Sequence, residues 1–274
     1  MKIIEKKFFI GIDLGWKEKK TTGLCILEKG GQKLIPEGNY CSKCPSSRAE
    51  PRTRAELGSG QSRTELCSGA GLTTGLPRSE LRSTSGCKDI FGKDIFRIIA
   101  PYLKNTEAVA IDAPLTKGRG KGKMRLYEKF LSTEIFRKER VMPIPPALME
   151  KFCDFARELR QKFEKRGFVL DMNLIEVFPT LVKKICGENL FFAVFGKNLK
   201  KPCQNENQES VLVCAILAYL HANFKTRYLG YKDGFLFLPQ MSFWKRDWRQ
   251  KFYQAWMARS RLKYHHLITN VFAK

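Results

Sequence analysis

The sequence predicts an α/β fold that opens with a three-stranded antiparallel meander and continues with strands and helices in alternation. Two observations support this prediction. Short apolar runs rich in β-branched residues recur along the chain, and a glycine, a proline or a carboxylate ends most of them. Between the later runs, apolar residues repeat with the spacing of a helix. The 274 residues, 43% of them hydrophobic, suffice for one large domain or two small ones with a real core.

The meander is expected in residues 7–40. Its first strand, residues 7–14, is a buried apolar run that carries one carboxylate, Asp13, near its end. The second strand is expected at residues 22–27, and a turn lets residues 33–40 pair back as the third. A charge in a buried strand is costly unless a cation or hydrogen bonds receive it, so Asp13 is a candidate functional residue. The alternative is that Asp13 caps a turn, a common role of aspartate.

Residues 41–88 differ in composition from the rest of the chain. They contain no Phe, Trp, Tyr, Ile, Val or Met, and a degenerate Arg-x-Glu-Leu unit recurs at residues 54–57, 63–66 and 78–81. Such a segment cannot bury enough apolar area to offset the entropy lost on ordering, so a disordered low-complexity insertion is expected. A minority interpretation is a zinc site formed by four thiolates, those of Cys41, Cys44, Cys67 and Cys87.

A second strand with a terminal carboxylate follows the insertion. An amphipathic helix is expected from residue 89, and Pro101 should end or kink it. Residues 108–115 then repeat the pattern of the first strand, because an apolar run ends on Asp112 and Pro114 stops it.

A basic, glycine-rich loop, residues 117–123, comes directly after this strand. Its backbone amides, with Lys117, Arg119 and Lys121, could hold phosphate groups. The loop does not match a Walker A motif, and a solvated surface loop is the alternative.

The remainder of residues 1–239 continues the alternation of helices and strands. A helix at residues 124–138 brings Arg125 near the expected site, and a strand within residues 168–178 delivers a third strand-end acid, Glu176. The other expected elements are a helix at 147–165, a short helix at 180–186, a buried helix at 211–220 and a strand at 234–239. The buried helix begins with Glu206 and Glu209, on one face. Acids at a helix start are also favoured by the helix dipole alone.

Residues 240–274 form a basic aromatic tail, expected to be helical and separate from the domain of residues 1–239. The tail has eight Lys or Arg and one acid, and four aromatic residues recur every four positions: Trp244, Trp248, Phe252 and Trp256. This stripe should pack on the domain, with a base-stacking surface as the alternative.

Charge and cysteine content indicate the kind of partner and the cellular location to expect. Fifty Lys and Arg against 27 Asp and Glu give a net charge of +23, which favours a polyanionic partner, most simply nucleic acid. A basic surface kept for solubility or for life at high temperature is the alternative. Nine scattered cysteines and a charged N-terminus predict a reducing cytoplasmic location, and no apolar run is long enough to predict a membrane partner.

The acids that end strands or begin a helix form the candidate catalytic set: Asp13, Asp112, Glu176 and Glu206 or Glu209. Converging carboxylates repel each other, and a divalent cation relieves the repulsion. Hard oxygen ligands favour Mg²⁺ or Mn²⁺, and two such ions can drive phosphodiester hydrolysis. We therefore expect Asp13, Asp112 and Glu209 to bind metal, with Glu176 completing the catalytic set. Phosphate contacts are expected from Lys117, Arg119, Lys121 and Arg125.

Several motifs together resemble a known family. They are residues 11–16, 22–23 and 111–115, then Arg125, the Ile-Glu-Val-Phe-Pro of residues 175–179, a helix containing Cys-Ala, and residues 234–239. In this order they resemble domain-of-unknown-function family 429, predicted nucleases of the ribonuclease H-like fold, over residues 7–40 and 89–239. The resemblance implies a mixed sheet, three antiparallel strands followed by parallel ones, flanked by helices.

One position departs from the resemblance. The family usually has an aspartate at the start of the Cys-Ala helix, where this chain has Ser210, with Glu209 one residue earlier. A shift of one residue turns a side chain by about 100° around a helix. Either Glu209 substitutes after a local adjustment, or this chain has lost one metal ligand.

The leading functional hypothesis is a metal-dependent nuclease. One alternative is a nucleic-acid-binding protein without catalysis, which Ser210 and the basic tail would suit. Another is an ATP-dependent phosphotransferase of the actin and sugar-kinase type, because residues 11–15 also resemble the first phosphate loop of those folds. Those folds need two such lobes, and the sequence predicts one meander only.

Overall fold

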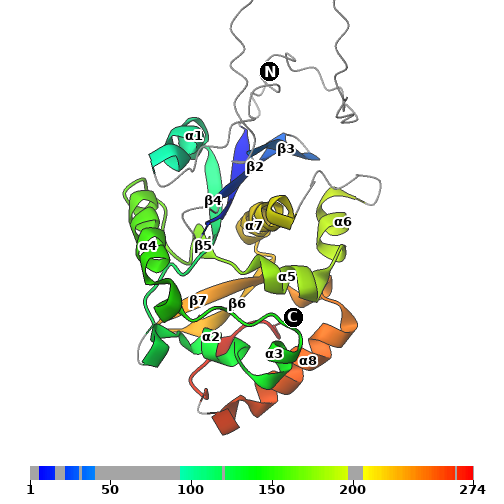
Figure 1. Cartoon of the computed structure of the whole chain (residues 1–274). Coiled ribbons are helices and arrows are strands. Elements are labelled where there is room, and N and C mark those ends of the chain that lie inside the picture. Colours follow the sequence, from blue (N-terminus) through cyan, green and yellow to red (C-terminus); the bar gives the residue numbers. More distant parts are fainter. Residues whose placement is uncertain are drawn as a thin grey trace, which may run out of the picture.

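The computed structural model of the chain describes residues 6–15, 22–30, 33–40, 93–118, 121–196, 206–262 and 264–273 (Figure 1). The expected insertion at residues 41–88, its four candidate zinc thiolates and Arg119 lie outside the described residues. No helix of the described ranges has the length and apolar character needed to cross a bilayer.

A five-stranded mixed sheet forms the centre of the molecule, with the strand order β3-β2-β1-β4-β5. The strands are β1 (Lys7–Asp13), β2 (Gly23–Gly30), β3 (Lys33–Tyr40), β4 (Thr106–Asp112) and β5 (Leu174–Glu176). β2 pairs antiparallel with both β1 and β3, whereas β4 lies parallel to β1 and β5 parallel to β4. The predicted meander and the α/β class with a mixed sheet are therefore confirmed.

Helices cover both faces of this sheet because its strands are apolar on both sides. Alternate side chains of β1, such as Ile10 and Ile12, pack with α1 (Lys93–Leu103) and α4 (Glu150–Glu164). Phe9, which precedes Ile10 and points to the other face of the sheet, packs with α7 (Glu206–Ala222). Pro101 does not end α1, which continues to Leu103. A proline this close to the C-terminal end of a helix removes only one of the last backbone hydrogen bonds.

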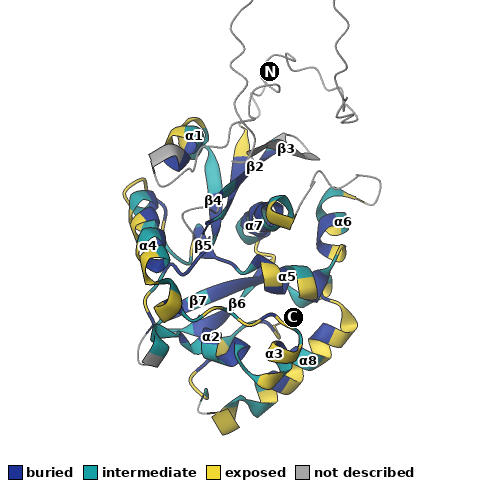
Figure 2. Ribbon diagram, in the orientation of Figure 1, coloured by how far each residue is buried: buried dark blue, intermediate teal, exposed yellow. Residues whose placement is uncertain are grey.

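The helix α7 runs over β1 (Figure 1), and its residues 211–218 are apolar and buried on all sides of the helix (Figure 2). Gly11 of β1 makes this contact possible. A Cβ at that position would lie 2.3 Å from the backbone nitrogen of Ala215 and 2.6 Å from the carbonyl oxygen of Val211. The missing side chain thus lets the helix backbone rest directly on the strand and places the start of α7 beside the end of β1.

A second, antiparallel sheet has the order β7-β6-β8, formed by β6 (Thr226–Tyr231), β7 (Gly234–Pro239) and β8 (Ile268–Thr269). Only β7 was predicted from the sequence. The strand β6 mixes polar and apolar residues around Gly230, and β8 is two residues long, so neither carries a clear alternating pattern.

The predicted helix at residues 124–138 is two helices, α2 (Leu126–Leu131) and α3 (Glu134–Lys138). The C-terminal helix α8 (Arg246–Ala258) packs against them, with the rings of Phe130 and Phe252 5.6 Å apart. Trp248 and Phe252 are buried in the same core as α7, so the stripe packs on the domain as predicted. The remaining helices are α5 (Pro179–Cys186), α6 (Asn189–Phe195) and the short 3₁₀ helices at Lys121–Lys123, Pro146–Met149, Met241–Phe243 and Arg259–Leu262.

Candidate functional site

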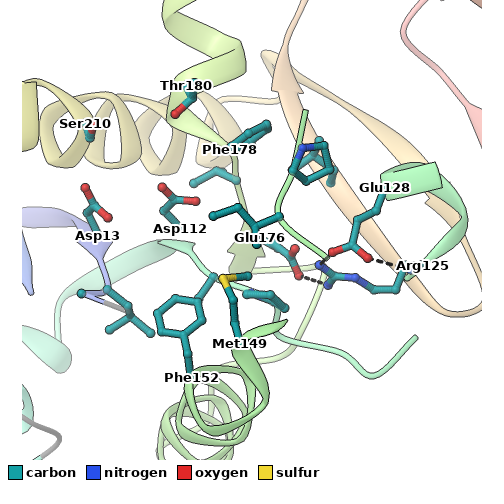
Figure 3. Close-up of a pocket in the computed structure, with 18 of the residues that line it drawn as sticks. Asp13, Asp112, Arg125, Glu128, Met149, Phe152, Glu176, Phe178, Thr180 and Ser210 are labelled. Carbon is teal, nitrogen blue, oxygen red and sulfur yellow. Dashed lines mark hydrogen bonds and ion pairs between the residues drawn. The ribbon is translucent and has the colours of Figure 1, made fainter. Parts of the chain in front are cut away.

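A cavity of about 540 Å³ lies at the carboxyl ends of β1, β4 and β5 (Figure 3). The first turns of α5 and α7 form its second side, and residues 143–152 form its third. In open α/β sheets this end of the strands is the usual place for ligands. The lining residues that matter below are Asp13, Asp112, Glu176, Ser210, Thr180, Asn207, Ile144, Met149, Phe152 and Phe178.

Asp13 and Asp112 are neighbours at the strand ends. The parallel register of β1 and β4 pairs them directly, and in Figure 3 both carboxylates point towards α7. Burial raises the pKa of the Asp112 carboxyl well above its ordinary value, and the nearby charges of Asp13 and Glu176 raise it further, while Lys183 opposes the shift. The pair therefore favours a bound proton or cation over two free negative charges.

The first turns of α7 present Ser210 and Asn207 to this cavity, but neither Glu206 nor Glu209 lines it. The Ser210 hydroxyl donates to the carbonyl oxygen of Glu206 at 3.0 Å and accepts a hydrogen bond from Lys183 Nζ at 3.1 Å. Glu209, predicted to be a metal ligand, is thus placed outside the cavity. This placement favours the second alternative for that position, the loss of an acid from the start of the helix.

Glu176 lies near the aspartates but does not join them. In the parallel pairing of β4 and β5, Glu176 lies opposite Ile111, so the two side chains point to the same face of the sheet. The next residue, Val177, donates its backbone N–H to the Ile111 carbonyl oxygen and lies beside Asp112. Successive side chains of a strand point to opposite faces, which places Glu176 one residue out of phase with Asp112. Its carboxylate turns to Arg125 instead (Figure 3).

The carboxylate of Glu176 is occupied by protein donors. Oε2 accepts hydrogen bonds from Arg125 Nη1 at 2.5 Å and from the backbone nitrogen of Leu115 at 2.8 Å, and Oε1 accepts one from the Tyr127 hydroxyl. Burial raises the pKa of Glu176, and the Arg125 charge opposes that shift. Glu176 lines the cavity as the acceptor of a buried polar network, and its expected part in the catalytic set stays a prediction.

Arg125, predicted to contact phosphate, is 1% exposed and belongs to the same network. Its Nη2 donates to Glu128, and its Nη1 donates to Glu176 and to Thr116 Oγ1. Burial alone would lower the pKa of the guanidinium, but the surrounding Glu176, Tyr127 and Glu128 raise it. The side chain therefore stays charged, and although Arg125 lines the cavity, its guanidinium is bound to protein acceptors.

The described residues of the basic loop, 117–118 and 122–123, do not line the cavity. Lys117 is exposed, next to a crevice where Lys123 pairs with Glu150. The side chain of Lys121 lies outside the described part of the chain, as does Arg119, so their expected phosphate contacts remain predictions.

Lys183 and the apolar wall were not predicted from the sequence. Lys183 projects from the second turn of α5 to Ser210, and it carries the positive charge that acts on Asp112. Ile144, Met149 and Phe152 line the cavity opposite the aspartates. Nothing local distinguishes Phe152 from the core residues of α4, and Lys183 resembles any lysine on a helix surface.

The donor set fits one divalent ion. The described residues contain no group of three or more His, Cys, Asp or Glu side chains able to hold a metal. Mg²⁺, however, is often bound by one or two carboxylates together with waters and substrate phosphates. Asp13 and Asp112 can provide the two carboxylates, whereas a second ion would lack protein ligands here.

Comparisons with family models, with curated proteins and with solved structures found no match to this chain.

Proposed function

We propose that this protein is a metal-dependent nuclease whose catalytic ion is held by Asp13 and Asp112. The observation that carries the proposal is the register of β1 and β4, which brings two carboxylates together in a cavity at the ends of two parallel strands. The raised pKa of Asp112 supports it, because a divalent cation would remove the repulsion that burial and Asp13 create.

The arrangement of the sheet supports a ribonuclease H-like fold as part of this proposal. Three antiparallel strands are followed by two parallel ones in the order β3-β2-β1-β4-β5, with helices on both faces. The resemblance to domain-of-unknown-function family 429 implies this sequence of antiparallel and parallel strands. Asp13 and Asp112 are the acids of that resemblance that lie side by side.

The residues of the cavity divide the work of hydrolysis between them. A bound Mg²⁺ or Mn²⁺ would supply a Lewis acid for the phosphate and for the attacking water. Asp13 and Asp112 would hold that ion at the strand ends. Lys183, whose Nζ donates to the cavity-lining Ser210 and whose charge acts on Asp112, would place a positive charge near the point where the charge of an attacked phosphate grows. The net charge of +23 attracts a polyanionic substrate.

A second candidate function is nucleic-acid binding without catalysis. The observation in its favour is that Lys183 already supplies a cation to the aspartates, while the start of α7 offers Ser210 where a third acid would lie. In that case nucleic acid would bind with a steep salt dependence and no metal-dependent cleavage would occur.

Calorimetric titration of Mn²⁺ tests the leading proposal. The wild-type protein should bind one ion, and Asp13→Asn should weaken the affinity by at least tenfold while the fold is retained. The matched control is Asp247→Asn, which removes an exposed carboxylate from α8 and should leave Mn²⁺ binding unchanged. Equal affinity in Asp13→Asn and wild type would refute the assignment.

A screen for cleavage of DNA and RNA in Mn²⁺ should accompany this titration. Cleavage that Asp13→Asn abolishes identifies the nuclease. Salt-dependent binding with neither metal binding nor cleavage identifies the second candidate.

A further inference from the structure

One wall of the cavity is apolar and faces the two aspartates. Met149, Phe152 and Ile144 form it, and Figure 3 shows the ring of Phe152 and the thioether of Met149 directed into the space below Asp13 and Asp112. These side chains come from one short stretch: Ile144 precedes the 3₁₀ helix Pro146–Met149, Met149 ends that helix, and Phe152 lies in the first turn of α4.

This wall lies at the margin of the packed face of α4. The helix buries Ala156, Leu159 and Phe163 in the core between the sheet and its helices. Phe152 packs against the edge of that core and is only partly buried, and Ile144 is 43% exposed. Because Phe152 also lines the cavity, a ligand there would cover its exposed part.

The cavity has an apolar wall and a charged wall, and together they indicate which class of ligand fits. Sites for small organic groups are largely apolar with a few placed polar groups, in cavities of about 300–1,000 Å³. A nucleobase has apolar faces and polar edges, and stacking of a base on an aromatic side chain contributes about 1–3 kcal/mol. The Phe152 wall suits the face of a base, while Asp13 and Asp112 line another side of the same cavity, where the metal and the phosphate of the same nucleotide would be.

We propose that Phe152 and Met149 form a subsite for one unpaired nucleobase next to the bond to be cleaved. This inference rests on the proposed nuclease function and defines its substrate class as single-stranded or locally unpaired nucleic acid. The physical reason is that a base within a duplex is stacked on both faces, so Phe152 can stack only on a base that has left the stack.

An organic cation is the competing occupant, because carboxylates and an aromatic ring can also bind an ammonium group. The net charge of +23 and the ammonium of Lys183, which is bonded to the cavity-lining Ser210, oppose a cationic ligand. The observations therefore favour the nucleobase.

Fluorescence anisotropy with a labelled 12-nucleotide DNA, as a single strand and as the matching duplex, tests the inference. The wild type should prefer the single strand. Phe152→Ala should weaken single-strand binding by about 5- to 150-fold, the equivalent of about 1–3 kcal/mol, with little change for the duplex. Phe152→Tyr should retain the preference. Leu148→Ala, at a residue 74% exposed and outside the cavity lining, is the matched control and should stay within twofold of wild type.

If Phe152→Ala is poorly folded, a second test uses Met149→Ala and a single-stranded DNA in which 2-aminopurine replaces one base. The wild type should quench 2-aminopurine in the single strand by stacking, and Met149→Ala should reduce the quenching. Equal wild-type binding to single strand and duplex, or equal losses for both in Phe152→Ala, would overturn the subsite. Saturable binding of phenethylamine without any preference for single strands would assign the wall to a cation instead.

These readouts do not depend on cleavage. A single-strand preference that requires Phe152, found without metal-dependent cleavage, would leave the subsite standing and remove the nuclease. Metal-dependent cleavage of duplex in preference to single strand would do the reverse.

Discussion

The buried network around Glu176 gives the sharpest prediction, since it separates a structural role from a catalytic one. Glu176→Gln keeps the shape of the side chain and removes its charge. The residue is 5% exposed and Arg125 is 1% exposed, so protein groups rather than bulk water stabilise both charges. The amide nitrogen of glutamine would also face a donor, because both carboxylate oxygens of Glu176 accept hydrogen bonds, from Leu115, Arg125 and Tyr127.

The expected magnitude follows from this geometry. Removing one charge of a buried, hydrogen-bonded pair costs about 3–5 kcal/mol when the other charge is left without compensation. Arg125 keeps its ion pair with Glu128, so we expect the lower end of that range, about 3 kcal/mol. At about 2–4 °C per kcal/mol for a domain of this size, the melting temperature should fall by about 6–12 °C. Tyr127→Phe removes a single hydrogen bond to a charged group and should cost less, about 1.5–3 kcal/mol.

Urea unfolding followed by far-UV circular dichroism measures the free energy of unfolding for both variants. The midpoint should fall with an unchanged dependence on urea concentration, and Mn²⁺ affinity at temperatures where the variant is folded should match wild type. A Glu176→Gln protein of unchanged stability that no longer binds Mn²⁺ would refute the reasoning and make Glu176 a metal ligand.

Two further predictions concern the aspartate pair and the helix above it. Asp112→Asn should abolish Mn²⁺ binding yet stabilise the metal-free protein by about 1–3 kcal/mol at neutral pH, because the raised pKa of Asp112 means that folding disfavours its charged form. The gain should vanish below the ordinary aspartate pKa, where both side chains are neutral. It should grow as the pH rises from that pKa towards the raised folded-state pKa, and stay constant above it. Thermal melts from pH 3 to 8 with no such trend would contradict this prediction. Gly11→Ala should lower stability by at least about 1–3 kcal/mol, since its Cβ would lie 2.3 Å from the Ala215 nitrogen, and an unchanged urea midpoint would show that α7 does not rest on β1 as described.

Several features could be predicted from the sequence because they depend on local patterns. Apolar runs ended by glycine or proline identified β1 and β4 and placed Asp13 and Asp112 at their ends. The short turn between β2 and β3 identified the meander, and the uninterrupted apolar run of residues 211–218 identified the buried helix α7. The spacing of apolar residues and the glycine or proline that ends a strand are properties of residues close together in the sequence. They can therefore be recognised without knowing what packs against the strand or helix.

Other features depended on partners far apart in the sequence. Glu176 ends a strand as Asp112 does, but its register against Ile111 points it to Arg125, 51 residues earlier. Lys183 acquires a position at the site only when α5 packs beside α7 and brings Ser210 within 3.1 Å. The pattern of a strand shows that successive side chains point to opposite faces of the sheet. Strand pairing and helix packing decide which of these side chains meet, and such contacts leave no local signal in the sequence.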